Sequence, residues 1–335
     1  MTYDNLISIE NLFQAWDEFK KGKLKKKDVQ EFAFRLEDNL FELHNRLKTK
    51  TYTHGTYQDF YVQDPKRRHI HKARVEDRIV HHLLYKYLYD VFDKTFIYDS
   101  YSCRVGKGTH KAVKRLEKFT RKASCNYTKP CWALKLDIKK FFASVDHKIL
   151  IRLLKEKIDD ISILKLLEHV ITSYNSENKI DSGIPLGNLT SQIFANIYLN
   201  ELDQFVKHTL KIKYYIRYAD DFIILDSDRD VLYKYTSISA LFLKNNLNLE
   251  LHPKKIILRK LDWGIDFLGY IILPYYRLPR TRTKRRILKK LTSRLNSENF
   301  NQSLQSYLGY LTHADSYIFA SNLKNEIWLL RAKSS

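Results

Sequence analysis

The chain has 335 residues, with 59 Lys and Arg against 38 Asp and Glu, a formal net charge of +21 and 44% hydrophobic residues. This composition excludes an intrinsically disordered protein, because a chain of this length can bury a large core in two or three lobes. The longest uncharged apolar stretch, residues 267–276, is too short to span a bilayer, and the first residues lack the regions of a signal peptide. We therefore expect a soluble, cytoplasmic protein with no membrane partner.

The positive charge is spread along the chain and interleaved with aromatic residues, which make up 13% of it. Such a field attracts polyanions, and nucleic acid is the polyanion that aromatic stacking surfaces suit. The alternative is an ordinary solvated surface in a protein from a lysine-rich proteome. Cys103, Cys125 and Cys131 are odd in number and form no CxxC pair, which argues against a disulfide framework and a four-ligand zinc site.

The predicted elements begin with helices, pass through strands and end in a helical tail. In chain order they are helix within 6–48, extended chain over 51–72, a long helix through 80–88, a helix from about 110, a strand over 132–138, helix within 147–173, a helix over 189–205, a hairpin over 213–226, a helix over 229–246, a strand over 255–260, a hairpin over 264–270 and helix after 279. This order predicts an α+β palm with mixed helices and a trailing helical lobe.

Acidic residues close two of the predicted strands. Asp137 follows the apolar run 132–136, and Asp220 with Asp221 separates the apolar runs 214–216 and 222–225. Two unit charges about 4 Å apart repel by roughly 4 kcal/mol at an effective dielectric of 20, so a fold that keeps adjacent aspartates there usually holds a cation. An ordinary polar hairpin is the alternative for Asp220 and Asp221 taken alone.

If the two strand ends meet, Asp137, Asp220 and Asp221 form a three-carboxylate cluster. Hard oxygen ligands select Mg²⁺ or Mn²⁺, and Mg²⁺ also binds substrate phosphates. Two such ions, roughly 3.5–4 Å apart, activate an attacking hydroxyl and stabilise a departing oxygen in phosphoryl transfer. The backbone carbonyl of Ile138 would supply a further ligand.

Five segments, in order, resemble the motifs of reverse transcriptases. They are residues 136–147 around Asp137, 183–199 beginning Gly-Ile-Pro-Leu-Gly-Asn-Leu-Thr-Ser-Gln, 218–221 (Tyr-Ala-Asp-Asp), 251–255 (Leu-His-Pro-Lys-Lys) and 265–270 (Ile-Asp-Phe-Leu-Gly-Tyr). A lone Tyr-x-Asp-Asp is weak evidence, whereas five motifs in this order over most of the chain are specific. The resemblance implies an RNA-directed DNA polymerase that uses two Mg²⁺ ions to copy template RNA into cDNA from a primer and deoxynucleoside triphosphates.

The resemblance also implies a right-hand architecture and its lobes. N-terminal helices and fingers would occupy residues 1–130, a palm with an antiparallel sheet and interleaved fingers elements 131–275, and a helical thumb 276–335. The start of that thumb is basic, as a lobe lying along a template–primer duplex requires, although a solvated helix face has the same composition. These basic residues are Arg277, Arg280, Arg282, Lys284, Arg285, Arg286, Lys289 and Lys290.

Carried over residue by residue, the resemblance assigns catalysis and metal binding to Asp137, Asp220 and Asp221. Phe142 stands where the family keeps an aromatic ring that blocks a ribose 2′-hydroxyl, but Phe141 could fill that place, and either could be a core residue. Lys254 or Lys255 would donate a proton to the departing pyrophosphate. The other predicted nucleotide-binding residues are Lys66, Arg68, Arg78, Leu186, Gly187 and Gln192, and the predicted primer grip is Phe267, Leu268, Gly269 and Tyr270.

Within the family, the chain most resembles the reverse transcriptases of diversity-generating retroelements. Group II intron enzymes usually carry Gln-Gly and Ser-Pro where this chain has Leu186-Gly187 and Ser191-Gln192. The segments 96–110 and 303–315 are similar to the fingers–palm junction and thumb of the retroelement enzymes. Such enzymes copy a structured template RNA with errors at adenines, and they act with a small, basic, pentameric accessory variability protein in bacteria, archaea or phages.

Two other functions share some of these features. Antiphage defence and group II-like reverse transcriptases have several of the same motifs. A catalytically silent RNA-binding scaffold would keep the basic surface, but the carboxylates at all three positions argue against it. If the chain is a retroelement enzyme, we expect that Leu186, which replaces the glutamine of many accurate relatives, loosens base discrimination.

Overall fold

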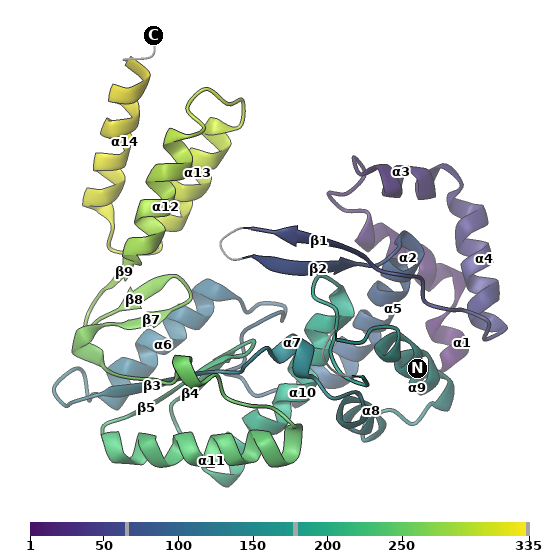
Figure 1. Ribbon diagram of the computed structural model, residues 1–335, viewed down its shortest axis with the longest axis horizontal. Coiled ribbons are helices and arrows are strands. Elements are labelled where there is room, and N and C mark those ends of the chain that lie inside the picture. The colour runs from purple at the N-terminus through teal and green to yellow at the C-terminus, as the bar shows by residue number, and fades with distance from the viewer. Residues whose placement is uncertain (64–66, 177–179, 333–335) are drawn as a thin grey trace.

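The computed structural model describes residues 1–63, 67–176 and 180–332 (Figure 1). Its first part is helical and contains α1 (Tyr3–Leu6), α2 (Ile9–Phe19), α3 (Lys27–Phe34) and α4 (Leu36–Lys48). The extended chain expected over 51–72 contains a hairpin of β1 (Gln58–Val62) and β2 (Arg68–Lys72). Two helices follow, α5 (Val75–Phe92) and α6 (Thr109–Ala123).

The middle of the chain alternates helices with the strands of the main sheet. Its elements are β3 (Trp132–Asp137), α7 (Phe141–Ser144), α8 (His147–Lys155), α9 (Ile161–Thr172), α10 (Leu189–Gln204), β4 (Tyr215–Tyr218), β5 (Asp221–Asp226), α11 (Arg229–Leu247) and β6 (Ile257–Lys260). The helical region expected over 147–173 is divided, because the Asp160 carboxylate accepts hydrogen bonds from the backbone N–H groups of Ser162 and Ile163 and begins a new helix there.

The main sheet is antiparallel with strand order β4-β5-β3-β6. Strand β5 lies in its interior, and the side chains from Phe222 to Leu225 are buried on both faces of the sheet. That burial explains a run of consecutive apolar residues with no polar alternation. The smaller sheet of β7 (Ile265–Phe267), β8 (Tyr270–Ile272) and β9 (Arg277–Pro279) stands between the main sheet and the last helices.

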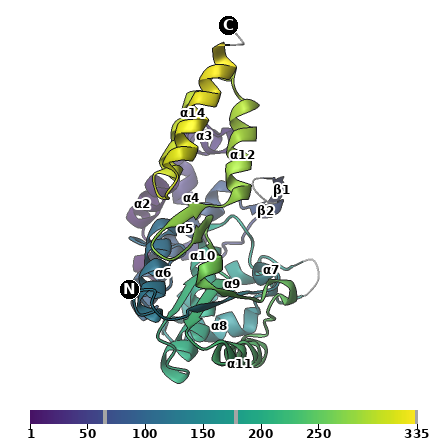
Figure 2. The ribbon, with the colours of Figure 1, turned by 90° about the vertical axis from the view of Figure 1, so that its left-hand side faces the viewer.

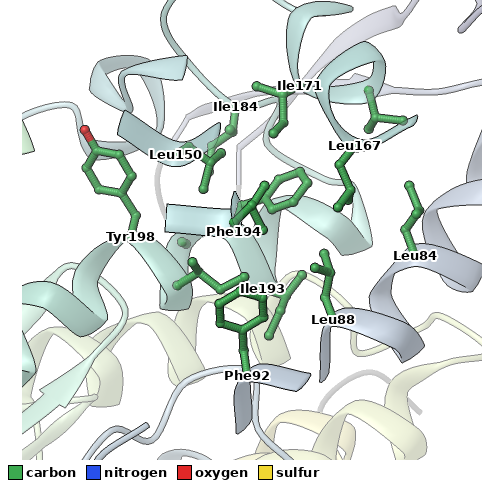
Figure 3. Close-up of a cluster of buried hydrophobic side chains, with 14 of the residues drawn as sticks. Leu84, Leu88, Phe92, Leu150, Leu167, Ile171, Ile184, Ile193, Phe194 and Tyr198 are labelled. Atoms are coloured by element: carbon green, nitrogen blue, oxygen red, sulfur yellow. The ribbon is translucent and has the colours of Figure 1, made fainter. Parts of the chain in front are cut away.

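The largest core joins the N-terminal helices to one side of the sheet. Helix α10 is apolar or small nearly all round its circumference, and it is buried because α5, α8 and α11 pack around it. Figure 3 shows the centre of this core, where Leu84 and Leu88 of α5, Leu167 of α9 and Ile193 and Phe194 of α10 point toward one another. The core thereby fixes the segment before α10, which contains the second predicted motif, against the fingers helices.

The last three helices, α12 (Thr281–Thr292), α13 (Phe300–Leu311) and α14 (Tyr317–Ala332), project away from the rest of the molecule (Figures 1 and 2). They have a small core of their own, which includes Ile287, Phe300 and Leu323. Two basic residues before α12 serve a structural role: Arg277 forms an ion pair with Glu117 of α6, and Arg280 forms one with Asp266. An ion pair within the protein does not test the expected contact with nucleic-acid phosphates, which stays a prediction for these two residues.

The fold therefore confirms the expected α+β architecture with an antiparallel sheet and a trailing helical lobe. None of the helices in the described ranges has both the length and the apolar character needed to cross a bilayer.

Candidate active site

The register of the main sheet brings the predicted carboxylates together. Asp137, the last residue of β3, is the direct partner of Asp221, the first residue of β5. Tyr218 pairs with Asp221 across the β4–β5 hairpin, so Ala219 and Asp220 form its two-residue tip. Ala219 adopts φ +53°, a left-handed conformation that costs free energy outside glycine and is frequent at functional turns.

Two lysines neutralise two of the three carboxylates. Lys255 Nζ lies 2.6 Å from Asp137 Oδ1, and Lys135 Nζ lies 3.3 Å from Asp221 Oδ2. Burial, with the charges of Asp137 and Asp221 beside it, raises the pKa of Asp220 to about 6. Burial also raises the pKa of Asp221, against the opposing effect of Lys135. The hairpin tip thus keeps negative charge in a place where a cation stabilises it.

The donor set fits a hard divalent cation that arrives with its substrate. Within residues 1–63, 67–176 and 180–332, no group of three or more Asp, Glu, His or Cys side chains lies close enough together to hold a metal ion, so the expected three-carboxylate cluster is not formed by side chains alone. Mg²⁺ seldom needs a cage of protein side chains, since it binds one or two carboxylates together with waters and substrate phosphates. Asp137, Asp220 and Asp221 would hold Mg²⁺ or Mn²⁺ only together with waters and substrate phosphates, and their role as metal ligands stays a prediction.

The backbone around Ile138 leaves room for the further ligand that the sequence predicts. Asp137 O accepts a hydrogen bond from His252 N at 2.8 Å, and Glu250 O accepts one from Lys139 N at 2.9 Å. These two bonds tie β3 to the segment before β6 without using the Ile138 carbonyl. The Ile138 ligand stays a prediction.

The structure distinguishes between the alternatives in two predicted pairs. Phe141 is buried, packs against Tyr198 and belongs to the core, whereas Phe142 is half-buried, and its carbonyl accepts a hydrogen bond from Ile184 N in the 183–192 turn at 2.8 Å. Lys255 contacts Asp137, whereas Lys254 is exposed. Phe142 and Lys255 are therefore the better placed residue of each pair.

The 183–192 turn is fastened to the β1–β2 hairpin. His71 N donates to Leu186 O at 3.0 Å, and Asn188 Nδ2 donates back to His71 O at 2.9 Å. Gly187 has φ +116°, and a Cβ there would lie 2.7 Å from Ile70 Cγ2, so glycine is required by both conformation and space. Leu186 is half-buried, and Gln192 is exposed at the start of α10.

Two of the three basic residues predicted in the fingers, Arg68 and Arg78, lie within the part of the chain that the structure describes. Lys66 lies outside the described residues, and Arg68 is exposed on β2. Arg78 forms an ion pair with Asp28 of α3, which also binds Lys72 at 2.7 Å. Arg78 lines a cleft of about 790 Å³ between the β1–β2 hairpin and the N-terminal helices, together with Lys72, Gly187, Asn188 and Gln192.

The residues of the predicted primer grip lie in the β7–β8 hairpin. Phe267 and Tyr270 are buried, while Leu268 at φ +48° and Gly269 at φ +99° form the tip. Tyr270 stacks on Tyr310 of α13 with ring centroids 4.9 Å apart. Leu268 and the backbone of the tip are thus the parts of this segment that can contact a primer, and Phe267 and Tyr270 support them from beneath.

Comparison with known proteins assigns the chain to a family. Residues 63–272, more than half of the chain, match the family described as reverse transcriptase (RNA-dependent DNA polymerase). The chain belongs to the reverse transcriptase family.

Its curated relatives include intron-encoded proteins. The reverse transcriptase is 24% identical over 305 residues to the group II intron-encoded protein LtrA of Lactococcus lactis subsp. cremoris, covering 70% of this chain and 50% of LtrA. It is 23% identical over 256 residues to the putative COX1/OXI3 intron 2 protein of Saccharomyces cerevisiae, covering 58% of this chain and 29% of that protein. It is 23% identical over 240 residues to protein YkfC of Escherichia coli, covering 59% of this chain and 61% of YkfC. The chain spans less than two thirds of the length of each.

Solved telomerase structures share the fold of this reverse transcriptase. The apo telomerase of Candida tropicalis aligns with a TM-score of 0.54 and 14% identity, covering 83% of this chain and 57% of that one. The telomerase of Candida albicans in complex with a TWJ fragment of telomeric RNA aligns with a TM-score of 0.51 and 12% identity, covering 85% of this chain and 61% of that one. The right-hand polymerase fold expected from the motifs is therefore confirmed.

Sequence reasoning missed a buried ion pair beneath the β4–β5 hairpin of this reverse transcriptase. Arg217 of β4 and Asp203 of α10 are fully buried and 2.6 Å apart, and Tyr215 also donates to Asp203 at 2.6 Å. Arg217 Nη1 donates to Ala219 O at 3.1 Å and so holds the strained tip. An arginine inside an otherwise apolar strand two residues before the hairpin tip was the available signal.

A chain of histidines behind the 183–192 turn was also missed. His81 Nδ1 lies 2.6 Å from Thr190 Oγ1, and His81 Nε2 lies 3.1 Å from His54 Nε2. His54 Nδ1 lies 2.7 Å from Gly55 O, and because a carbonyl only accepts, that nitrogen carries the proton. A neutral His54 then accepts from His81, which accepts from Thr190. The network ties the start of α10 to α5 and to the segment before β1.

Proposed function

We propose that this chain is an RNA-directed DNA polymerase that extends a primer on an RNA template by two-metal nucleotidyl transfer. The observation that carries the proposal is the β3–β5 register, which sets Asp137 opposite Asp221 with Asp220 at the adjoining tip. Two divalent ions, when bound, supply activation of the primer 3′-hydroxyl and stabilisation of the leaving pyrophosphate. Asp137, Asp220 and Asp221 hold them, with the Ile138 carbonyl as a further ligand.

The surrounding residues position the reactants. Lys255, beside Asp137, is placed to protonate the departing pyrophosphate, and Phe142 excludes a ribose 2′-hydroxyl by its bulk. Leu186, Gly187 and Gln192 lie against the nascent base pair. Lys66, Arg68 and Arg78 are the proposed triphosphate contacts in the fingers, with Arg78 available once the triphosphate replaces its Asp28 partner. The β7–β8 tip carries the primer.

The finer proposal is mutagenic copying in a diversity-generating retroelement, in the cytoplasm of a bacterium or archaeon. Its support is the Leu186–Gln192 turn, in which leucine replaces the usual glutamine at a half-buried position fastened to β2. The proposed partners are a structured template RNA and a basic pentameric accessory protein. Group II-like activity is the second candidate, favoured by the intron-encoded relatives.

Primer extension on a short RNA template tests the polymerase proposal. Asp220→Asn removes a proposed metal ligand and should reduce Mg²⁺-dependent extension by about 1,000-fold, because the chemical step loses its charge stabilisation. Asp226→Asn, at the opposite end of β5, is the matched control and should extend primers at nearly the original rate. Absence of Mg²⁺-dependent synthesis by the unaltered chain would favour the RNA-binding scaffold.

Sequencing the extension products tests the retroelement proposal. Leu186→Gln should lower misincorporation opposite template adenine several-fold, since the amide restores a polar contact near the incoming nucleotide. Leu186→Met keeps the apolar character and volume and should keep the error rate. Equal error frequencies in all three proteins contradict the assigned role of Leu186.

A further inference from the structure

A second cleft, of about 580 Å³, lies at the end of the molecule away from the carboxylates. It is formed by the end of α6, the 273–276 loop between β8 and β9, and residues 312–315 after α13. Figure 1 shows these elements below the last three helices, and Figure 2 turns that side toward the viewer. Residues 124–131 lead from this cleft into the start of β3, whereas Asp137 ends β3, so a strand of six residues, about 20 Å, separates the two sites.

Three tyrosines give the cleft an aromatic wall. Tyr275 is 81% exposed and Tyr276 is 47% exposed. The ring of Tyr127 meets that of Tyr275 edge to face, with centroids 4.6 Å apart. Tyr275 therefore stands fixed by Tyr127 while most of its surface faces solvent, which is the arrangement that a stacking partner needs.

The backbone beneath these rings is strained. Tyr275 has φ +69°, and Cys125, Asn126 and Tyr127 form a consecutive left-handed run with φ +49°, +59° and +67°. Non-glycine residues adopt this conformation at a cost in free energy, and such residues gather at ligand sites. The run 125–127 follows the end of α6, where Asn126 N donates to Arg121 O at 2.8 Å, and it places Tyr127 beside Tyr275.

The charged residues of the cleft leave an excess of positive charge for a ligand. Glu117 is neutralised by Arg277, whose Nη1 lies 2.9 Å from both carboxylate oxygens. Asp315 accepts a hydrogen bond from the backbone N–H of Arg277 at 3.2 Å. Lys118 and Arg121 are exposed on the adjacent face of α6, and Asn126 Oδ1 orients the Arg121 guanidinium at 2.8 Å.

We propose that this cleft binds a single-stranded segment of RNA outside the catalytic site. Unpaired bases stack on Tyr275 and Tyr276, and Lys118 and Arg121 contact the flanking phosphates. Aromatic faces beside cations suit single-stranded nucleic acid, because its bases stack on the rings and its phosphates pair with the cations. This inference rests on the proposed function in one respect, because the RNA segment is taken to be part of the template RNA. The cleft would then be a second binding site for that RNA on the polymerase.

Binding of a labelled RNA, with the catalytic site already filled, tests the proposal. The chain is first loaded with a dideoxy-terminated primer, an RNA template, the next deoxynucleotide and Mg²⁺. A fluorescent 12-nucleotide oligouridine containing 4-thiouridine is then titrated by anisotropy, and its photo-crosslinks are mapped. Tyr275→Ala with Tyr276→Ala removes two stacking surfaces and should weaken binding at least about 30-fold and remove the crosslinks.

Further variants separate stacking from charge and from damage to the fold. Tyr275→Phe keeps the ring and should bind within about twofold of the unaltered chain. Arg121→Ala should lower the slope of log affinity against log salt by about 0.7, the value for one phosphate of a single strand. Tyr233→Ala removes an exposed tyrosine beside Arg229 on α11, away from the cleft, and should change nothing. If the double variant does not fold, the RNA affinity and crosslinks of Tyr276→Ala alone are measured instead.

The outcomes distinguish this site from the polymerase proposal. Unchanged RNA affinity and unchanged crosslinks in the double variant overturn the proposed RNA site. Loss of binding to a protein partner, with the RNA affinity intact, also overturns it. Primer extension on the short template should be unaffected by the tyrosine changes. If extension fails in the unaltered chain while tyrosine-dependent crosslinks to the oligouridine persist, the polymerase proposal fails and the RNA site stands.

Discussion

His81 illustrates how one buried side chain acts on the active site through its neighbours. Burial lowers the pKa of His81 to about 3, with a smaller contribution from the nearby Arg78 charge. The ring is therefore neutral at physiological pH and can accept a hydrogen bond from Thr190 while donating to His54. In the unfolded chain the same ring takes up a proton near pH 6.5. Acid therefore favours unfolding, and the pH affects the 183–192 turn, which is proposed to contact the nucleotide.

His81→Gln should make the fold less sensitive to acid. Between the unfolded pKa near 6.5 and the folded pKa of about 3, the unfolded state binds the extra proton, so stability present above pH 6.5 is lost as the pH falls. His81 accounts for about 2 kcal/mol of that loss at pH 5. Urea unfolding at pH 7.5, 6.5 and 5 measures it. His208→Gln, at an exposed position, should retain the original pH profile, and an unchanged profile in His81→Gln contradicts the prediction.

At the scale of elements, the decisive contact is between the 183–192 turn and β2. Both segments are short, and neither has a hydrophobic face large enough to hold the other. Their attachment depends on two hydrogen bonds to the backbone of His71 and on the close approach that Gly187 permits to Ile70. The β1–β2 hairpin and the proposed nucleotide site therefore move together.

Gly187→Ala should separate them. The added Cβ meets Ile70 at 2.7 Å and must also adopt φ +116°, so we expect a loss of roughly 1–3 kcal/mol in stability and a higher KM for deoxynucleotides. Gly22→Ala is the matched control, because Gly22 has φ +68° and no atom within 4 Å of an added methyl group, which isolates backbone strain from steric contact. Equal effects of the two changes on KM argue against the packing explanation.

At the scale of the whole molecule, the helical lobe α12–α14 is joined to the body through few contacts. Tyr310 Oη donates to Gly269 O at 2.7 Å and its ring stacks on Tyr270, while Arg277 and Arg280 form ion pairs with Glu117 and Asp266. Since the lobe has its own core, these contacts determine its orientation more than its folding. They also link the β7–β8 tip, the proposed primer grip, to the lobe that would follow the duplex.

Tyr310→Ala should loosen the lobe without unfolding it. Loss of the stack and of the hydrogen bond should increase amide exchange in α13 and in the β7–β8 hairpin, while α10 keeps its protection. Tyr310→Phe retains the stack and should lose only about 1 kcal/mol. Tyr317→Ala, at an 87% exposed position on α14, is the control. Unchanged exchange at the hairpin in Tyr310→Ala would show that other contacts, such as the stacked rings of His110 and His313, hold the lobe.

The sequence by itself determined the elements and the chemistry of the candidate site. Apolar runs ending in Asp137 and flanking Asp220 and Asp221 indicate strand ends and a hairpin, because periodicity and turn residues are local properties of the chain. The order of the motifs then identified the family, which the family match over residues 63–272 confirms.

Only the tertiary structure showed how neighbouring residues of the same type differ in their surroundings. Phe141 packs against Tyr198 of α10 while Phe142 is half-buried, and Lys255 contacts Asp137 of β3 while Lys254 is exposed. The Arg217–Asp203 pair, the histidine network and the tyrosine cleft join segments distant in the chain. Strand register and helix packing set these contacts through the free energy of the whole core, which no local pattern records.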